Sequence, residues 1–97
     1  MAEHALNVAP DVYTVLFEND RLRVIEVRME PGSRTEMHSH PDNLVYGLSS
    51  GKVAFTAPSG EVVELEVPAG EAMWMEATEH ATEHVEGTVH ALMIEPK

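Results

Sequence analysis

Apolar and polar residues alternate in short runs along most of the chain. From residue 62 to residue 67, for example, glutamates at 64 and 66 alternate with Val63, Leu65 and Val67. A period of two is typical of a β-strand that buries one face. The pattern predicts nine strands: Val12–Phe17, Leu22–Met29, Glu36–His40, Leu44–Ser49, Lys52–Ala57, Val62–Val67, Ala72–Met75, His80–His84 and Val89–Ile94.

Turn signals rich in Gly, Pro, Asn and Ser separate these runs at short, fairly even intervals. No segment has a helical stripe, and the best helix candidate, Glu3–Val8, is too short to be stable alone. Many short strands joined by such turns predict an all-β sandwich or small barrel. We expect residues 1–97 to form a single domain.

Composition and charge exclude several classes of function. The 97 residues are 43% hydrophobic, which is enough for a packed core, and they include no cysteine. Disulfides, zinc–thiolate sites, iron–sulfur clusters and thiol catalysis are thereby excluded. A net charge of −11 disfavours binding to nucleic acid or to an anionic membrane surface. No apolar run is long enough to span a bilayer, and Met1–His4 does not begin a signal peptide, so we expect a soluble cytoplasmic protein.

The most informative residues for chemistry are two histidines, His38 and His40. In an extended strand, residues two apart point to the same face, so both imidazoles enter one space. Two convergent neutral imidazoles are half of a transition-metal site. Downstream, a Pro68–Gly70 turn leads into a short apolar strand and then to His80, which the turn could bring back across a barrel to the first pair.

These segments resemble the two sequence motifs of the cupin superfamily. The first motif is matched by Gly32, by His38-Ser39-His40 after five residues, and by Gly51 at its far end. The second is matched by Pro68–Gly70 followed by His80. The resemblance covers residues 16–94 approximately.

The resemblance implies a cupin-type double-stranded β-barrel with His38, His40 and His80 as metal ligands. Three imidazoles on one face bind a divalent first-row metal and leave coordination positions open for water or substrate. Imidazole suits several metals, so ligand type does not choose among them. Iron is the metal we expect first, with zinc, nickel, manganese and copper as alternatives.

The chain departs from the family pattern at two positions. No glutamate follows the histidine pair: an ungapped match places Leu44 at that position, and a shift of one residue places Asn43 there. Asp42 is the nearest acid, and after a proline it is expected to shape the turn. The second departure is His84, where the family usually has Asn. His84 is either a fourth ligand, a group that orients His80, a general base, or a histidine at the barrel mouth with a water partner.

A neutral three-histidine site resembles those of cysteine dioxygenase and the diketone-cleaving dioxygenases. It implies metal-dependent oxidation of a small organic substrate that arrives as an anionic chelate. In this scheme His84 or Tyr46 assists proton movement, and Arg34 contacts the substrate anion. The alternatives are a non-catalytic module that binds or senses a small ligand, and a zinc or nickel isomerase or hydrolase.

Three adjacent residues, Met73, Trp74 and Met75, cannot all face inward in one strand. One face is expected to fill the core while the other meets a second subunit. The resemblance likewise implies a homodimer that pairs through outer sheets. His90, in the last predicted strand, is expected at the surface or at that interface.

Overall fold

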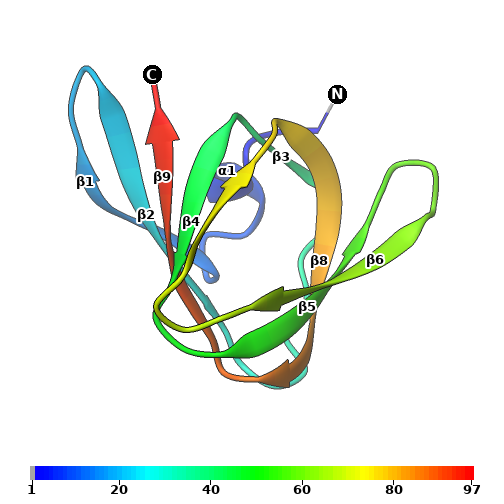
Figure 1. Cartoon of the computed structure of the whole chain (residues 1–97). Coiled ribbons are helices and arrows are strands. Elements are labelled where there is room, and N and C mark those ends of the chain that lie inside the picture. Colours follow the sequence, from blue (N-terminus) through cyan, green and yellow to red (C-terminus); the bar gives the residue numbers. More distant parts are fainter. Residues whose placement is uncertain (1) are drawn as a thin grey trace.

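The computed structural model describes residues 2–97 and contains nine strands and one short helix (Figure 1). All nine predicted strands are present, with ends that differ by a few residues. The elements are α1 (Ala5–Val8), β1 (Tyr13–Glu18), β2 (Leu22–Met29), β3 (His38–His40), β4 (Asn43–Gly47), β5 (Gly51–Thr56), β6 (Val62–Val67), β7 (Ala72–Met75), β8 (Thr78–Gly87) and β9 (Val89–Pro96).

The strands form two sheets that enclose one core. The order is β1-β2-β9-β4-β7 in the five-stranded sheet and β3-β8-β5-β6 in the four-stranded sheet, and all strand pairs are antiparallel. In β9, the alternate residues Val89, Ala91 and Met93 are buried, as a period of two requires. The predicted all-β barrel is therefore confirmed.

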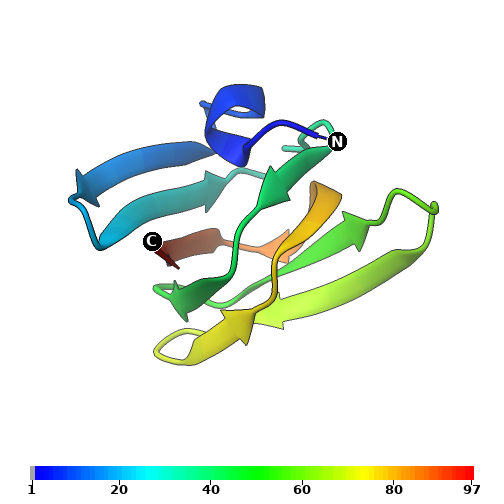
Figure 2. The ribbon, with the colours of Figure 1, turned by 90° about the horizontal axis from the view of Figure 1, so that it is seen from above.

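The N-terminal segment packs beside β1 and β3 (Figure 2). The His4 ring caps α1, since its Nδ1 accepts a hydrogen bond from the Leu6 N–H at 3.0 Å. The other ring nitrogen, Nε2, then donates to Glu95 Oε2 at 2.8 Å, and Arg23 holds the second carboxylate oxygen at 3.3 Å. Four residues would not hold a helix in isolation, so these contacts stabilise it. No helix in residues 2–97 is long and apolar enough to cross a membrane.

A close backbone approach fixes the position of β7. A Cβ atom on Gly47 would lie 2.1 Å from the Pro68 carbonyl oxygen, so only glycine fits at the end of β4. The Gly70 N–H donates to the Gly47 carbonyl at 2.8 Å, and the Gly47 N–H donates to the Glu71 carbonyl at 3.0 Å. The predicted Pro68–Gly70 turn thus brings β7 alongside β4 with Met73 and Met75 on the inner side.

Candidate metal centre

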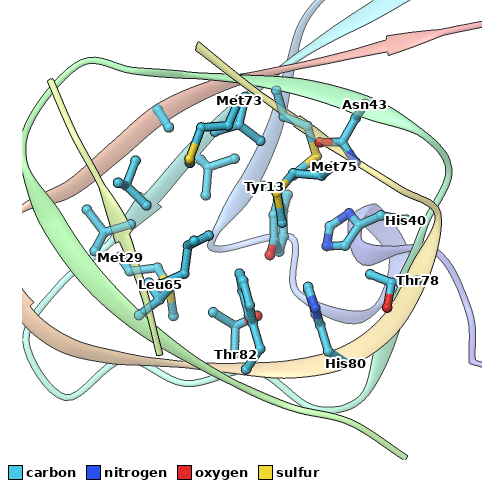
Figure 3. A pocket seen from close by; sticks show the side chains of 18 residues that line it. Tyr13, Met29, His40, Asn43, Leu65, Met73, Met75, Thr78, His80 and Thr82 are labelled. Carbon is cyan, nitrogen blue, oxygen red and sulfur yellow. The ribbon is translucent and has the colours of Figure 1, made fainter. Parts of the chain in front are cut away.

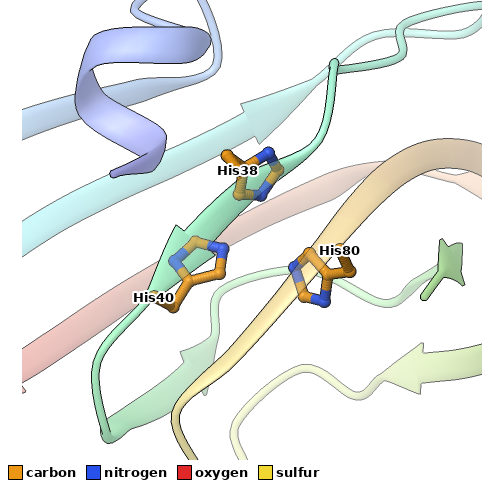
Figure 4. A group of neighbouring side chains, drawn as sticks. All are labelled: His38, His40 and His80. Carbon is orange, nitrogen blue, oxygen red and sulfur yellow. The ribbon is translucent and has the colours of Figure 1, made fainter. Parts of the chain in front are cut away.

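Three histidines converge where β3 pairs with β8. The register places His38 directly opposite His80, and His40 lies two residues further along the same face. One ring nitrogen from each lies within 4.8 Å of the others, and the ring centroids are 4.7 to 5.1 Å apart (Figure 4). The structure therefore brings together the three residues that the sequence analysis predicts as metal ligands.

Burial keeps these imidazoles neutral. Their exposed fractions are 0% for His38, 5% for His40 and 6% for His80. Burial, followed by repulsion from the neighbouring histidines, lowers the pKa of His40 to about 3. Burial and the charge of His38 lower the pKa of His80 to about 4, and burial also lowers the pKa of His38. Near neutral pH all three rings carry the lone pairs that a metal needs.

Neighbouring groups fix two of the rings. His38 Nδ1 lies 2.8 Å from the Glu36 carbonyl oxygen, which can only accept a hydrogen bond, so Nδ1 carries the proton. His38 Nε2 is consequently left with its lone pair. The Phe55 ring stacks on His80 with centroids 4.1 Å apart and planes within 5°. Such outer contacts are typical of histidines that bind metals.

The ring nitrogens fit a divalent metal ion. His40 Nδ1 and His80 Nε2 are both buried and have no hydrogen-bond partner among residues 2–97. An ion such as zinc holds imidazole nitrogens at about 2.1 Å, which places neighbouring ligand atoms roughly 3–3.5 Å apart. The ligand atoms of the three histidines lie within 4.8 Å of one another, and they would move closer together to hold one ion. A bound cation would also satisfy the two unpaired nitrogens.

His40 and His80 stand at one end of a partly open cavity of about 60 Å³ (Figure 3). Four of the six methionines line it, together with valines, Leu65 and Phe55. Its described lining includes no charged side chain, and the polar side chains there are those of Tyr13, Asn43, Thr78 and Thr82 beside the histidines. The cavity thus joins a group of metal-ligating atoms to a small apolar chamber.

Tyr13 is a residue of the site that the sequence analysis missed. Its hydroxyl lies 3.3 Å from His38 Nε2, and its ring packs edge-on against both His38 and His40 with centroids 5.4 Å apart. Burial raises its pKa, so the phenol keeps its proton and acts as a donor. Only its position at the start of a predicted strand was visible in the sequence.

The structure does not bring His84 to the three histidines. It lies on β8 four residues beyond His80, which at about 3.3 Å per residue is about 13 Å along the strand. Its Nε2 donates to the Gly87 carbonyl at 2.7 Å. A period of two puts His84 on the same face of β8 as His80, but the four-residue separation along the strand keeps their rings apart.

Two further predicted residues also lie away from the cluster. Tyr46 alternates with the cavity-lining Val45 and therefore faces outward, with 39% of its surface exposed. Arg34 is exposed, and its backbone forms an isolated antiparallel bridge with the backbone of Glu83. Neither residue lines the cavity.

The turn between β3 and β4 carries the residues that align with the missing glutamate. Asp42 Oδ1 accepts a hydrogen bond from the Ala77 N–H at 2.8 Å, so this acid shapes the turn as expected. Asn43, by contrast, is 2% exposed and lines the cavity. Leu44 points to the outer face, with 37% of its surface exposed.

No protein-family model and no curated protein matches the chain. Among solved structures, it is similar to a cupin domain from Bordetella pertussis, with 28% identity over 89% of this chain and 92% of that one and a TM-score of 0.79. A cupin 2 conserved barrel domain protein from Leptotrichia buccalis is 25% identical over 89% of this chain and 40% of its own, with a TM-score of 0.66. The polyketide cyclase RemF from Streptomyces resistomycificus shares the fold, at 22% identity over 87% of this chain and 63% of its own and a TM-score of 0.64.

The lowered histidine pKa values predict acid-sensitive stability of the metal-free protein. An unfolded histidine titrates near 6.5, whereas native His40 and His80 titrate at about 3 and about 4. Below pH 6.5 the unfolded chain binds protons that the native protein does not, so this stability is present above 6.5 and is lost as the pH falls toward 4. Each histidine contributes up to about 1.4 kcal/mol per pH unit, measurable by urea unfolding between pH 7.5 and 5.

A matched pair of variants tests whether His40 contributes to this loss of stability at low pH. His40→Asn is expected to reduce the slope and leave the part that His80 contributes, while His84→Gln, on the same strand as His80 but outside the cluster, is expected to keep the full slope. An unchanged slope in His40→Asn would contradict the assignment.

Proposed function

We propose that this chain, which is a small protein of the cupin superfamily, binds one divalent transition metal through His38, His40 and His80. The observation that carries this proposal is the convergence of three buried imidazoles, with one ring nitrogen of each within 4.8 Å of the others. Two of those rings have a buried nitrogen without a partner in the described part of the chain. Iron is the first candidate, and zinc, nickel, manganese and copper suit the same ligands.

The reaction that this site supports best is oxidation of a small organic substrate, as in a metal-dependent dioxygenase. A bound metal would supply Lewis acidity and an electron path for a substrate that shares its open positions. The chain's own groups hold the ligand rings and supply an apolar cavity beside them in which a small substrate would lie. Tyr13, whose hydroxyl is 3.3 Å from His38 Nε2, is placed to donate a hydrogen bond beside the metal position.

Two other functions use the same site. The first is a non-catalytic module that binds or senses a small ligand, for which a small apolar cavity suffices. The second is an isomerase or hydrolase that uses zinc or nickel. Similarity to a polyketide cyclase at 22% identity concerns the fold, and one fold carries many chemistries. Experiment therefore has to separate the three.

Replacing a ligand histidine is expected to abolish metal binding. His38→Ala and His80→Ala each remove one of three ligands, whereas His90→Ala removes a ring on the outer face that pairs with Glu26 at 2.8 Å. Elemental analysis of protein purified without chelator is expected to give about one metal per chain for the wild type and His90→Ala, and almost none for the other two. Equal stoichiometry in all four proteins would refute the site.

Oxygen consumption distinguishes the dioxygenase from the alternatives. With Fe(II) bound, the wild type is expected to consume oxygen in the presence of a small diketone, thiol or phenol, while His80→Ala does not. Turnover with zinc or nickel and no oxygen uptake would favour the isomerase or hydrolase. Ligand-induced thermal shifts without turnover of any kind would favour the binding module.

A second copy of the chain is the partner that we propose. Register pairing aligns an apolar row across all five strands on the outer face of the larger sheet: Phe17, Val24, Ile94, Leu44 and Trp74. Trp74 is 53% exposed and Phe17 54% exposed, which is unusual for a row of this length on a monomer. Charges beside the row are paired, since Glu26 contacts both His90 and Arg28, so two copies can meet there despite their net charge.

A charge placed in that row is expected to separate the dimer. Trp74→Lys should sediment as a monomer at micromolar concentrations at which the wild type is a dimer. Val62→Lys is the matched control, because Val62 is 59% exposed but lies on the smaller sheet. A dimeric Trp74→Lys protein would rule out this interface.

A further inference from the structure

Several polar atoms of cavity-lining residues have no hydrogen-bond partner among residues 2–97, and the side-chain oxygen of Asn43 is one of them. Asn43, the first residue of β4, is 2% exposed. Its Nδ2 donates to the Pro41 carbonyl at 2.9 Å, which fixes the orientation of the amide. Its Oδ1 is buried and has no hydrogen-bond partner in the part of the chain that the structure describes. A buried carbonyl oxygen without a donor is unusual, so a donor from outside the chain is expected.

The residues around Asn43 limit which kind of ligand group could donate a hydrogen bond to its Oδ1. Figure 3 shows Asn43 at the end of the cavity where His40 lies, with its oxygen toward Met75. Asn43 and His40 flank the same Pro41-Asp42 turn, which the Asp42–Ala77 hydrogen bond holds in place. The acceptor therefore lies at the end of the chamber that holds the histidines, while methionine and valine side chains line most of the remainder.

We infer that Asn43 Oδ1 recognises an O–H or N–H group of the ligand that fills this cavity. The inference rests on the proposed metal site, because the cation would hold the anionic group of that ligand. Three neutral imidazoles and a neutral amide leave the full charge of the metal to be balanced by the ligand. The ligand class that meets all three conditions is a short-chain α-hydroxy acid: a carboxylate for the cation, a neighbouring hydroxyl for Asn43, and a small apolar body.

Asn43 is thus a specificity-determining residue. A carboxylate at this position would compete with the ligand anion for the cation and repel it from the cavity. An apolar side chain would leave the ligand hydroxyl without an acceptor. Asn provides the acceptor without the charge, which favours an anion that carries a donor over one that does not.

A matched pair of ligands tests this role. Isothermal titration of the metal-loaded protein with 2-hydroxybutyrate and with butyrate compares two anions that differ by one hydroxyl. The wild type is expected to bind 2-hydroxybutyrate about tenfold more tightly or better, a ratio that one buried hydrogen bond can supply. Equal affinities, or no binding of either anion, would overturn the inference.

Variants separate Asn43 from direct chelation by the ligand hydroxyl. Asn43→Leu, which is similar in size, is expected to reduce the ratio to about one, and Asn43→Asp is expected to weaken 2-hydroxybutyrate more than tenfold. Thr78→Val, another change of a polar residue lining the cavity, should keep the wild-type ratio. A full ratio in Asn43→Leu, or wild-type affinity in Asn43→Asp, would overturn the role of Asn43.

Metal content measured on the same samples distinguishes this inference from the proposed function. Normal metal content with no discrimination between the two anions removes the role of Asn43 and leaves the metal site. Absence of metal from the wild type removes both.

Discussion

The pairing of β3 with β8 is the contact on which the site depends. It sets His38 opposite His80, and a slip of one residue would turn the imidazoles of β3 to the other face. β3 is an edge strand of three residues and holds this register with help from both sides. The Ser39 N–H donates to the Glu3 carbonyl at 2.8 Å, and the Thr35 N–H donates to the Thr82 carbonyl at 2.8 Å. The N-terminal segment and the loop before β3 therefore help to hold His38 and His40 opposite His80.

The sequence was sufficient to predict the strands and the three histidines because both depend on local periodicity. Alternation located all nine strands, and a spacing of two placed His38 and His40 on one face. His80 needed more, namely the Pro68–Gly70 turn and the family resemblance. These signals are short-range, or are anchored by residues whose backbone role can be recognised.

The residues that sequence reasoning misplaced or missed mark the limit of what a local pattern can predict. His84 shares a strand with His80, yet distance along the strand removes it from the cluster. Tyr46 is on the outward-facing side of β4. This orientation became clear only from the structure, in which Asn43 and Val45 line the cavity. Tyr13 reaches His38 across the two sheets, a contact between residues 25 positions apart that no local pattern encodes. The cluster of three histidines was predictable, whereas the groups around it follow from the packing of one sheet on the other.

The surface of the chain and the lining of its cavity differ in charge. The chain has a net charge of −11, and its acids attract a divalent cation while they repel an anion at long range, within a Debye length of about 8 Å at physiological salt. Inside residues 2–97 Glu95 is the one buried carboxylate, and Arg23 and His4 already hold it. The cavity lining has no fixed charge of either sign, so a cation held by the three histidines would be the charge that attracts an anion there. The same burial that keeps the three imidazoles neutral thus leaves the metal-free cavity without a charge that would attract an anion.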